Sequence, residues 1–518
     1  MSRAEIFFYG KDFTPLQSAN KFQFGYKCFI DGKEKQFNSN EKKGKGIKEI
    51  LSEISLDKEK QFDLLKSFLF KAQENIDELI TDKSLNFEEK QIYTYVNQQI
   101  YFGGLVGVVC IKNFPIRDKV NIDITLQIDS RFDPFPSNNT KEIKPYFLMT
   151  LLFNDFVPLN NSQVNRDKDG LTDMLLLYSF IEKYKVAYAK GYFKTYHSFK
   201  NNDSKVKGSI DVARHVKTNI GLNNGKICYN HKEKTESNYI NHLIVEAYEK
   251  LKRKYYKQTL SSFKNVDYLR ESIEYLKCLI DYPKYSRKIL ISKNLNILSH
   301  SYYTEYEDMR KICLKILRDE KISVFNGNDN ENKVEGILMY IPKLWEKYIE
   351  NYLHGFRYKT QDKIRILDVN SKNDFRQLTQ PDFVFYNDEK PFMILDAKFK
   401  PGWMNVATTG EVGSLLLSDY DKCVRDMVTI NAHSTGVIFP TNEYIINKED
   451  LFVKADETFE YKHNISKYNQ RDKFYTFPIF IPPIDDNFLA WKQKFSENCK
   501  IIFSYINCII KQQLSNSN

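Results

Sequence analysis

The chain has 518 residues, of which 42% are hydrophobic, 14% aromatic and 28% charged, and its 77 Lys and Arg outnumber its 67 Asp and Glu. The aromatic content excludes global disorder, because disordered chains lack the apolar surface that offsets the entropy of folding. The counts of 20 Gly and 15 Pro exclude collagen-like and low-complexity classes. At roughly 150 residues per domain the length favours three or four domains, and the net charge of +10 gives only a weak preference for anionic partners.

The sequence lacks the usual signals for export or membrane insertion. No stretch near its start combines the basic, apolar and small-residue regions of a secretory signal. The apolar span at 171–184 is interrupted by charge well before the ~18 residues that a membrane helix needs. The eight cysteines include no CxxC pair, which argues against structural zinc. We therefore expect a cytoplasmic protein without membrane contact.

Residues 104–129 have the pattern of β structure. Residues 104–114 form a largely apolar run, and residues 120–129 alternate strictly between apolar and polar positions. Pro and Asn turn residues then end the β segment, and a helical pattern follows at 145–156. We expect a mixed α/β region over residues 1–165.

The next region, residues 166–333, is expected to be helical and basic. Helix patterns start at about residue 170 and again at 239–256, and the polar stretch 326–333 ends the region. The second helix ends in the basic residues Lys252, Arg253 and Lys254. Such a run is most often a solvated helix face, but these cations are also candidates for neutralising DNA phosphates.

Residues 334–518 have the pattern of an α/β domain. The expected order is helix, three strands, helix, strand, over residues 340–356, 363–369, 381–386, 391–400, 417–431 and 434–440. Near the C terminus a further helix is predicted, whose apolar residues keep helical spacing and should pack on the core: Phe488, Trp491, Phe495, Ile502 and Ile506.

Three ionisable residues interrupt the apolar strands of this last region. Asp396 and Lys398 are two apart in one strand, so their side chains point to the same face. Asp382 opens the preceding strand, at the same end of the predicted hairpin. Two close carboxylates repel unless a cation lies between them, and Mg²⁺ or Mn²⁺ suits their hard oxygen atoms. With Lys398 to orient water or stabilise a pentavalent phosphate, the set fits metal-assisted phosphodiester hydrolysis. The structural alternative is a salt bridge at a sheet end.

The segment 381–400 resembles the active-site hairpin of the PD-(D/E)xK nuclease superfamily. Over roughly residues 100–445 the chain resembles the McrC family, the nuclease subunits of McrBC-type modification-dependent restriction systems. The resemblance implies that Asp382, Asp396 and Lys398 are the catalytic residues of a C-terminal PD-(D/E)xK core.

The resemblance also implies how a metal ion would be held. Asp382 and Asp396 would bind it, with the backbone carbonyl of Ala397 as an added ligand. Glu346, on the preceding helix, stands where many such nucleases have another acidic ligand, although an exposed helix Glu explains it equally well. Many relatives carry a Gln-x-x-x-Tyr pattern on the helix after the Lys. This chain does not, so Tyr420, Lys422 and Arg425 are only candidates for DNA contact.

McrC-like proteins act with a separate AAA+ GTPase, McrB, which forms rings and recognises methylated DNA. The resemblance therefore implies an McrB-like partner that docks on the N-terminal region and is stimulated by it, and double-stranded, modified DNA as the substrate. The phosphate-binding pattern GxxxxGK followed by Ser or Thr is absent, so we expect this chain itself to bind no nucleotide.

These observations predict a Mg²⁺-dependent DNA endonuclease subunit of a restriction or phage-defence complex. Two alternatives stay open. The chain would be a non-catalytic docking and GTPase-activating scaffold if it binds no divalent metal in the presence of DNA. It would be a stand-alone DNA repair nuclease if it cuts DNA without nucleotide or partner.

Overall fold

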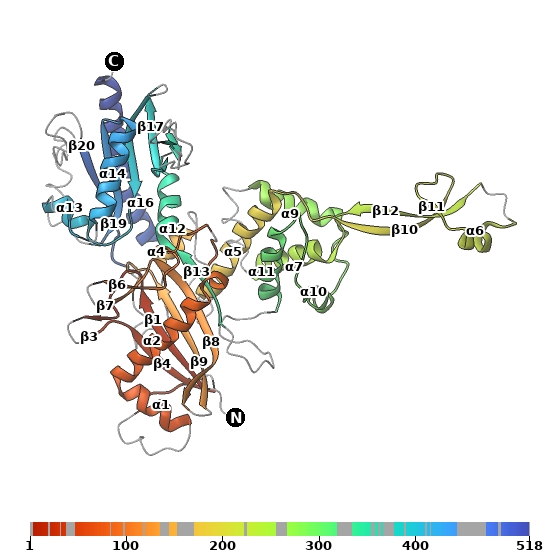
Figure 1. Ribbon diagram of the computed structural model, residues 1–518, viewed down its shortest axis with the longest axis horizontal. Helices are drawn as coiled ribbons and strands as arrows, with labels where there is room; N and C mark the ends of the chain where they lie inside the picture. The colour runs from red at the N-terminus through yellow and green to blue at the C-terminus, as the bar shows by residue number, and fades with distance from the viewer. Residues whose placement is uncertain are drawn as a thin grey trace, which may run out of the picture. The chain divides into compact units, whose positions relative to one another are not determined.

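A computed structural model gives the fold of the chain (Figure 1). The chain divides into two compact units: the first holds residues 1–154, 160–168 and 329–518, and the second holds residues 155–159 and 169–328. The residues that the structure describes are 4–18, 21–31, 33–37, 47–82, 84–96, 99–117, 120–134, 145–152, 170–221, 225–254, 267–318, 334–353, 358–360, 364–365, 378–387, 390–409, 412–414, 416–442, 473–484 and 488–516.

The N-terminal part of the first unit is built on a six-stranded sheet with the order β13-β8-β9-β1-β4-β5. β1 pairs parallel with β9, and the other neighbouring pairs are antiparallel. Its strands are β1 (Ala4–Lys11), β4 (Gly25–Ile30), β5 (Lys33–Glu34), β8 (Leu105–Arg117), β9 (Val120–Asp129) and β13 (Val334–Tyr340). Two short ribbons pair β2 (Gln17–Ser18) with β3 (Lys21–Phe22) and β6 (Tyr93–Val96) with β7 (Gln99–Phe102).

Three helices accompany this sheet: α1 (Ile47–Leu56), α2 (Lys58–Glu74) and α3 (Ile76–Leu79). α2 begins at Asp57, whose carboxylate accepts a hydrogen bond of 3.0 Å from the backbone N–H of Glu59 and so caps the helix. Its apolar side, including Leu65 and Phe68, is buried in one hydrophobic core with Phe8 of β1. The first hundred residues, for which the sequence gives no clear architecture, thus complete the same sheet as β8 and β9.

The sequence predicts β8 and β9 correctly, but β9 is buried more completely than its alternating pattern indicates. The polar positions Asp123, Gln127 and Asp129 are buried as well as the apolar ones. Gln127 Nε2 donates to both carboxylate oxygens of Asp129, at 2.9 and 3.1 Å, which satisfies part of this polar face. Both faces of the strand are therefore covered.

β13 belongs to the N-terminal sheet, because Val334–Tyr340 pairs with Leu105–Ile111 of β8. The domain boundary predicted at residue 334 is therefore wrong, because it places β13 in a different domain from the sheet to which this strand belongs. The apolar character of β13 gives a strand pattern but does not say which sheet it joins. The polar stretch 326–333 itself lies outside the described residues.

The C-terminal part of the first unit is built on a five-stranded sheet with the order β14-β17-β18-β19-β20. The first three strands are antiparallel, whereas β18, β19 and β20 run parallel. The strands are β14 (Tyr358–Thr360), β17 (Phe383–Asn387), β18 (Lys390–Ala397), β19 (Ser434–Thr441) and β20 (Lys473–Phe480). The helices are α4 (Tyr146–Leu152), α12 (Ile341–Glu350), α13 (Trp403–Thr409), α14 (Leu417–Ile430) and α16 (Phe488–Asn516).

α12, β17, β18, α14 and β19 confirm five of the six predicted elements, but the strand expected at 363–369 is wrong as the first member of this sheet. β14 takes that place beside β17. Within the expected range, Ile364–Arg365 forms β15, which pairs with β16 (Leu378–Thr379) in a separate ribbon, and residues 366–369 lie outside the described residues. β14 has the sequence YKT, which is too short and polar to give a pattern.

The C-terminal helix is confirmed as α16. Its predicted apolar residues are buried, with Trp491 stacked on Phe495 at 5.4 Å between ring centroids and close to Tyr146 of α4. The helix therefore packs on the core, as expected. Within the described part of the chain, no helix has both the length and the apolar character that crossing a bilayer requires.

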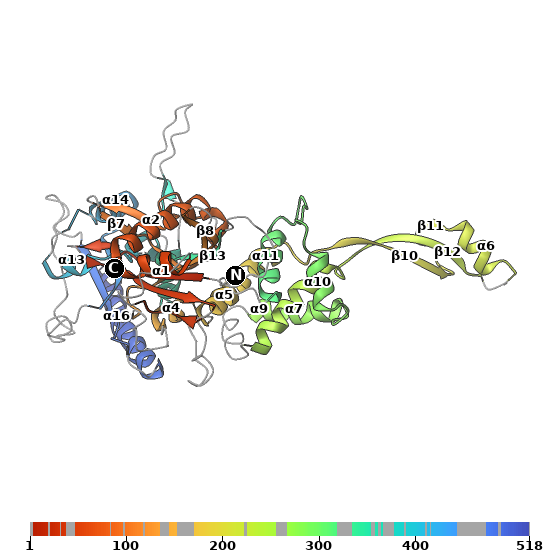
Figure 2. The ribbon, with the colours of Figure 1, turned by 90° about the horizontal axis from the view of Figure 1, so that it is seen from below.

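The second unit contains a group of helices and a long β arm, whose three strands have the order β10-β12-β11 (Figure 2). The helices are α5 (Gly170–Tyr188), α7 (Tyr239–Lys254), α9 (Asp267–Leu279), α10 (Arg287–Lys293) and α11 (Glu305–Leu317). The arm consists of β10 (Thr195–Asp203), β11 (Ser209–Ile210), α6 (Val212–Asn219) and β12 (Ile227–Thr235). The expectation of a helical region is therefore wrong for the arm. β10 is largely exposed, so its sequence carries no apolar alternation to reveal a strand.

Candidate active site

The register of the β17–β18 hairpin brings the two predicted aspartates together. Phe383 lies opposite Leu395, so Asp382 and Asp396 are neighbours at the end where the hairpin opens. The backbone N–H of Asp382 donates to Oδ1 of Asp396 at 3.2 Å, and Oδ2 of Asp382 accepts from the backbone N–H of Ala397 at 2.8 Å. Asp396 is buried and Asp382 is partly buried. Each carboxylate is therefore held by the backbone of the opposite strand.

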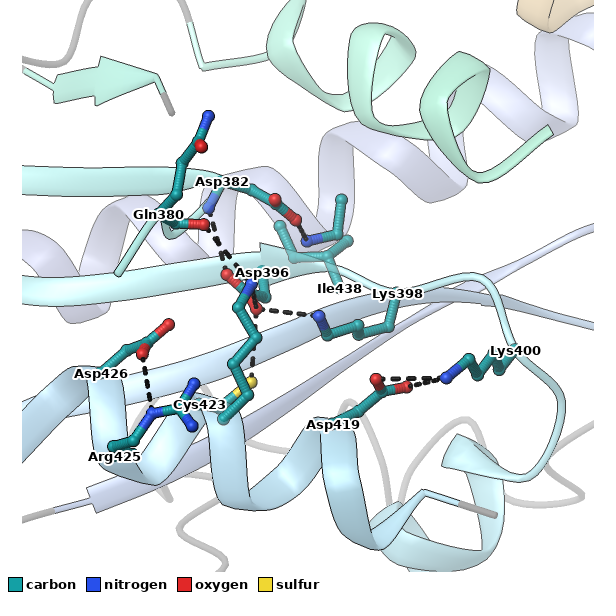
Figure 3. A network of polar contacts seen from close by, with 12 residues as sticks. Gln380, Asp382, Asp396, Lys398, Lys400, Asp419, Cys423, Arg425, Asp426 and Ile438 are labelled. Atoms are coloured by element: carbon teal, nitrogen blue, oxygen red, sulfur yellow. Dashed lines mark hydrogen bonds and ion pairs between the residues drawn. The ribbon is translucent and has the colours of Figure 1, made fainter. Parts of the chain in front are cut away.

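The predicted lysine lies directly on this pair. Nζ of Lys398 is 2.9 Å from Oδ2 of Asp396, as the same-face argument requires (Figure 3). Lys398 follows the last residue of β18, and its backbone N–H donates to the carbonyl of Ile438 on β19 at 2.9 Å. The parallel β18–β19 pairing thus continues through the lysine and fixes the start of its side chain.

Helix α14 adds two further side chains to the site. Nζ of Lys422 is 3.4 Å from Oδ2 of Asp396 and 3.4 Å from the carbonyl of Gln380. The Sγ atom of Cys423 lies 3.5 Å from the same carboxylate oxygen (Figure 3). Cys423 is also part of an apolar cluster, and burial raises the pKa of its thiol well above the usual value. It is therefore a neutral packing residue that touches the site.

The surroundings of the site shift the pKa values of the two carboxyl groups in opposite directions. Burial, together with the charge of Asp396, raises the pKa of Asp382 to about 8. Burial also favours the neutral form of Asp396, but the ammonium groups of Lys398 and Lys422 hold the pKa of Asp396 well below its usual range. Burial and the charge of Asp396 thus favour the protonated form of Asp382, whereas the two lysines favour the ionised form of Asp396.

This donor set fits a hard divalent cation. Two adjacent carboxylates that cannot both ionise easily are the arrangement that an added positive charge relieves. Among the described residues, no group of three or more His, Cys, Asp or Glu side chains is arranged to hold a metal. Asp382 and Asp396 would therefore share an ion with backbone oxygens, water and substrate phosphate, which is how Mg²⁺ is commonly bound.

A family model described as the McrBC 5-methylcytosine restriction system component matches residues 100–413, more than half of the chain. The chain belongs to the McrBC family. No curated protein matches it.

Two solved structures share low similarity with this McrBC-family chain. A refined half-complex from a tetradecameric assembly of Thermococcus gammatolerans McrB AAA+ hexamers with bound McrC aligns over 85% of this chain and 93% of that chain, with 13% identity and a TM-score of 0.42. The cryo-EM structure of the Thermococcus gammatolerans McrBC complex aligns over 56% of this chain and 79% of that chain, with 14% identity and a TM-score of 0.23.

The remaining residues predicted for the site differ in how they relate to the carboxylate pair of Asp382 and Asp396. The charge of Glu346 contributes to raising the pKa of Asp382, so this helix residue acts on the site electrostatically. Tyr420 packs on Phe474 of β20, with ring centroids 4.9 Å apart. Arg425 is half exposed, and its Nε atom lies 3.6 Å from the Asp426 carboxylate. Of the three α14 candidates, Lys422 is thus the one that contacts the carboxylate pair.

The basic run on α7 belongs to the second unit. Nζ of Lys252 is 2.7 Å from Glu274, and Arg253 lies 3.4 Å from Glu246. The side chain of Lys254 lies outside the described residues. Lys252 and Arg253 are therefore paired with carboxylates, and their contact with DNA stays a prediction.

The closeness of Lys422 to Asp396 is a feature that sequence reasoning missed. In the sequence the two are separated by 26 residues and lie on different elements. The available signal was that Lys422 directly precedes Cys423, which forms a buried stripe of α14 with Met427 and Ile430. Lys422 was predicted only as a DNA contact, whereas it also lowers the pKa of Asp396.

Proposed function

We propose that this chain is the metal-dependent DNA endonuclease subunit of a McrBC-type complex, and that it cuts DNA when assembled with an AAA+ GTPase that it stimulates. The observation that carries the proposal is the contact of Lys398 with Asp396 beside the paired Asp382. The order α12, β14, β17, β18, α14, β19 supports a PD-(D/E)xK core, with the short ribbon β15–β16, the helix α13 and the strand β20 as additions.

In this proposal each residue of the site has a defined task. Asp382 and Asp396 hold Mg²⁺ or Mn²⁺, with the Ala397 carbonyl as a further candidate ligand, while Glu346 would act through its charge rather than as a third carboxylate ligand. The bound ion would supply an acidified water and polarise the scissile phosphate. Lys398, fixed by Ile438 and Asp396, would orient the attacking water and stabilise the charge that develops on the phosphate. Loss of the proton from Asp382 completes the negative pair that the ion requires.

The substrate and partner parts of the proposal follow from the family. The family model names a 5-methylcytosine restriction system, so double-stranded DNA that carries 5-methylcytosine is the substrate to test. A protein partner is supported by exposed apolar side chains on the arm of the second unit, outside the N-terminal region where the family resemblance places docking, namely Ile210, Val212, Val216 and Ile220. We infer that an McrB-like AAA+ GTPase is that partner.

The proposal is tested by Asp396→Ala in the complex reconstituted with its GTPase, with methylated DNA and Mg²⁺. We expect cleavage to be lost. The matched control is Asp421→Ala, because Asp421 is an exposed carboxylate on α14. Unchanged cleavage by Asp396→Ala would overturn the proposal.

One observation favours a non-catalytic scaffold. Two lysines already neutralise Asp396, so the cluster could be a buried ion pair with no metal. Calorimetric titration of Mn²⁺ in the presence of DNA separates the two functions, since the nuclease binds the ion and the scaffold does not. Cleavage by this chain without nucleotide or partner would instead indicate a stand-alone nuclease.

A further inference from the structure

The residue that follows the site lysine is held by the N-terminal sheet. Phe399 is buried, and its carbonyl accepts a hydrogen bond from Nη2 of Arg131, 268 residues earlier in the chain. The Arg131 guanidinium also lies 4.4 Å from the centroid of the Phe399 ring and 4.6 Å from that of Phe132. The side chain of Arg131 thus contacts both the backbone carbonyl and the ring of Phe399.

Arg131 is itself fixed in one orientation. It follows the end of β9, and its Nη1 lies 2.8 Å from Oδ2 of Asp12, just after β1. The backbone N–H of Arg131 donates to the other oxygen of the same carboxylate. Asp12 is fully buried, and only 14% of the Arg131 side chain is exposed. Because the donors of a guanidinium form a rigid planar fork, holding one edge on Asp12 sets the direction of the other edge.

The backbone on the other side of Phe399 is anchored too. The N–H of Lys398 donates to the carbonyl of Ile438 at 2.9 Å, and the indole N–H of Trp345 donates to that same carbonyl at 3.3 Å. Lys398 therefore lies between two fixed points, one on β19 and one on the N-terminal sheet. Its side chain must then reach Asp396 from a backbone that has little freedom to shift.

Stability alone is a poor explanation for Arg131. A buried ion pair in apolar surroundings commonly contributes no more than a well-packed apolar residue of similar volume. The surroundings here are apolar, since Phe13, Phe132 and Phe399 all lie against the guanidinium. What an apolar residue would lack is the directed hydrogen bond to the carbonyl of Phe399.

We propose that Arg131 is a positioning residue for Lys398. Through Arg131, the folded N-terminal sheet would determine the geometry of the active site. This inference rests on the proposed function, in which Lys398 serves phosphodiester hydrolysis. The fork of Arg131 fixes the carbonyl of Phe399, and the backbone between that carbonyl and Ile438 presents the lysine to Asp396.

The experiment compares Arg131→Gln and Arg131→Lys with a matched control, Lys343→Ala. Lys343 also joins N-terminal and C-terminal segments of the first unit, through Asp82 at 2.7 Å and Ser84 at 3.1 Å, and neither of these partners belongs to the contacts of Phe399 described above. Hydrogen exchange of peptides covering residues 397–403 measures the anchoring directly and requires no catalysis. Single-turnover cleavage of methylated DNA by the reconstituted complex measures its effect on the reaction.

We expect Arg131→Gln to speed exchange in residues 397–403 about tenfold and to lower the cleavage rate about 100-fold with an unchanged KM for DNA. Arg131→Lys retains the charge that faces Asp12, so its melting temperature should return to that of the unmodified chain. Its exchange in residues 397–403 and its cleavage rate should stay at the levels of Arg131→Gln. Lys343→Ala should leave exchange and cleavage as in the unmodified chain.

Three results would overturn the proposal. Exchange in residues 397–403 that is unchanged in Arg131→Gln would show that the anchor does not hold the lysine. Full recovery of exchange and cleavage by Arg131→Lys would show that charge alone matters. A cleavage loss that only follows the fraction of unfolded protein would assign Arg131 to stability. If the unmodified complex cuts no DNA, the proposed function fails, while the exchange measurement still decides the role of Arg131.

Discussion

The backbone N–H of Asp382 donates to the carboxylate of Asp396 over 3.2 Å, although 14 residues separate them in the sequence. This hydrogen bond and its counterpart from Ala397 hold the two acidic groups side by side. Burial and the charge of Asp396 raise the pKa of Asp382 to about 8, which favours its protonated form and so reduces the repulsion within the pair.

A first prediction follows for metal binding. Because a ligand must be deprotonated to bind a metal, ion binding at neutral pH should release the proton of Asp382. The affinity for Mn²⁺ should then rise about tenfold per pH unit below pH 8 and level off above it. Calorimetry in two buffers with different ionisation enthalpies measures the protons released. Release of no proton at pH 7 would contradict this account of the pair.

A second prediction concerns the two lysines. Lys398→Ala should lower single-turnover cleavage by about 10²- to 10³-fold, because it removes the charge proposed to face the developing phosphate charge. Lys422→Ala should have a smaller effect, since this lysine lies farther from Asp396, at 3.4 Å against 2.9 Å.

The control for this pair of variants is Lys400→Ala. Lys400 lies two residues beyond Lys398 but pairs with Asp419 at 3.1 Å and has a partly exposed side chain. It should cut at the unmodified rate. Equal losses from all three variants would mean that general positive charge, rather than the position of Lys398, is what the reaction needs.

A third prediction concerns stability and pH. Burial favours the neutral acid, but hydrogen bonds from Lys343 and Ser84 lower the pKa of Asp82 to about 2. A carboxyl group whose pKa is lower in the folded than in the unfolded chain stabilises the fold at pH values above its unfolded pKa, which is about 4. This contribution is lost as the pH falls towards 2. Because the Asp82 side chain is 36% exposed, we expect only about 1 kcal/mol.

Melting temperatures of Asp82→Asn and the unmodified chain should therefore differ at pH 7 and converge as the medium is acidified from pH 4. Asp77→Asn is the control, because Asp77 also pairs with a lysine but is 77% exposed. A difference for Asp82→Asn that persists unchanged into acid would contradict the ion-pair explanation.

A fourth prediction concerns the C-terminal helix. Trp491→Ala should destabilise the first unit by about 3–5 kcal/mol, because the indole is fully buried and packs against Phe488, Phe495 and Tyr146. Ile501→Ala on the same helix should cost far less, since Ile501 is 48% exposed. Chemical unfolding monitored by far-UV circular dichroism, a signal that does not depend on the tryptophan removed, measures the free energy of unfolding of both variants. Equal effects would mean that α16 does not pack as described.

The hairpin of the site was predictable from sequence because local patterns determine it. Apolar runs define β17 and β18, the turn between them is short, and strand periodicity places Asp396 and Lys398 on one face. The same reasoning located α14 and β19. It failed for β14, whose three residues carry no pattern, and for β10, whose exposed faces give no alternation.

Contacts between distant segments were out of reach for a different reason. Nothing local in the sequence around Arg131 indicates that its partners are Asp12 and Phe399, because that pairing depends on how two sheets pack together. Likewise, β13 is a clear strand whose membership of the N-terminal sheet is decided by its pairing with β8. Periodicity predicts elements and faces, whereas tertiary packing decides which faces meet.

The most direct test of the central claim is single-turnover cleavage of methylated DNA by the complex that contains Asp396→Asn, measured together with GTP hydrolysis by the partner. This substitution keeps the shape of the side chain and removes its charge. We predict that cleavage falls by at least about 100-fold while GTP hydrolysis stays at the level given by the unmodified chain. Cleavage at the unmodified rate, with normal GTP hydrolysis, would contradict the assignment of the active site to the Asp382–Asp396–Lys398 cluster.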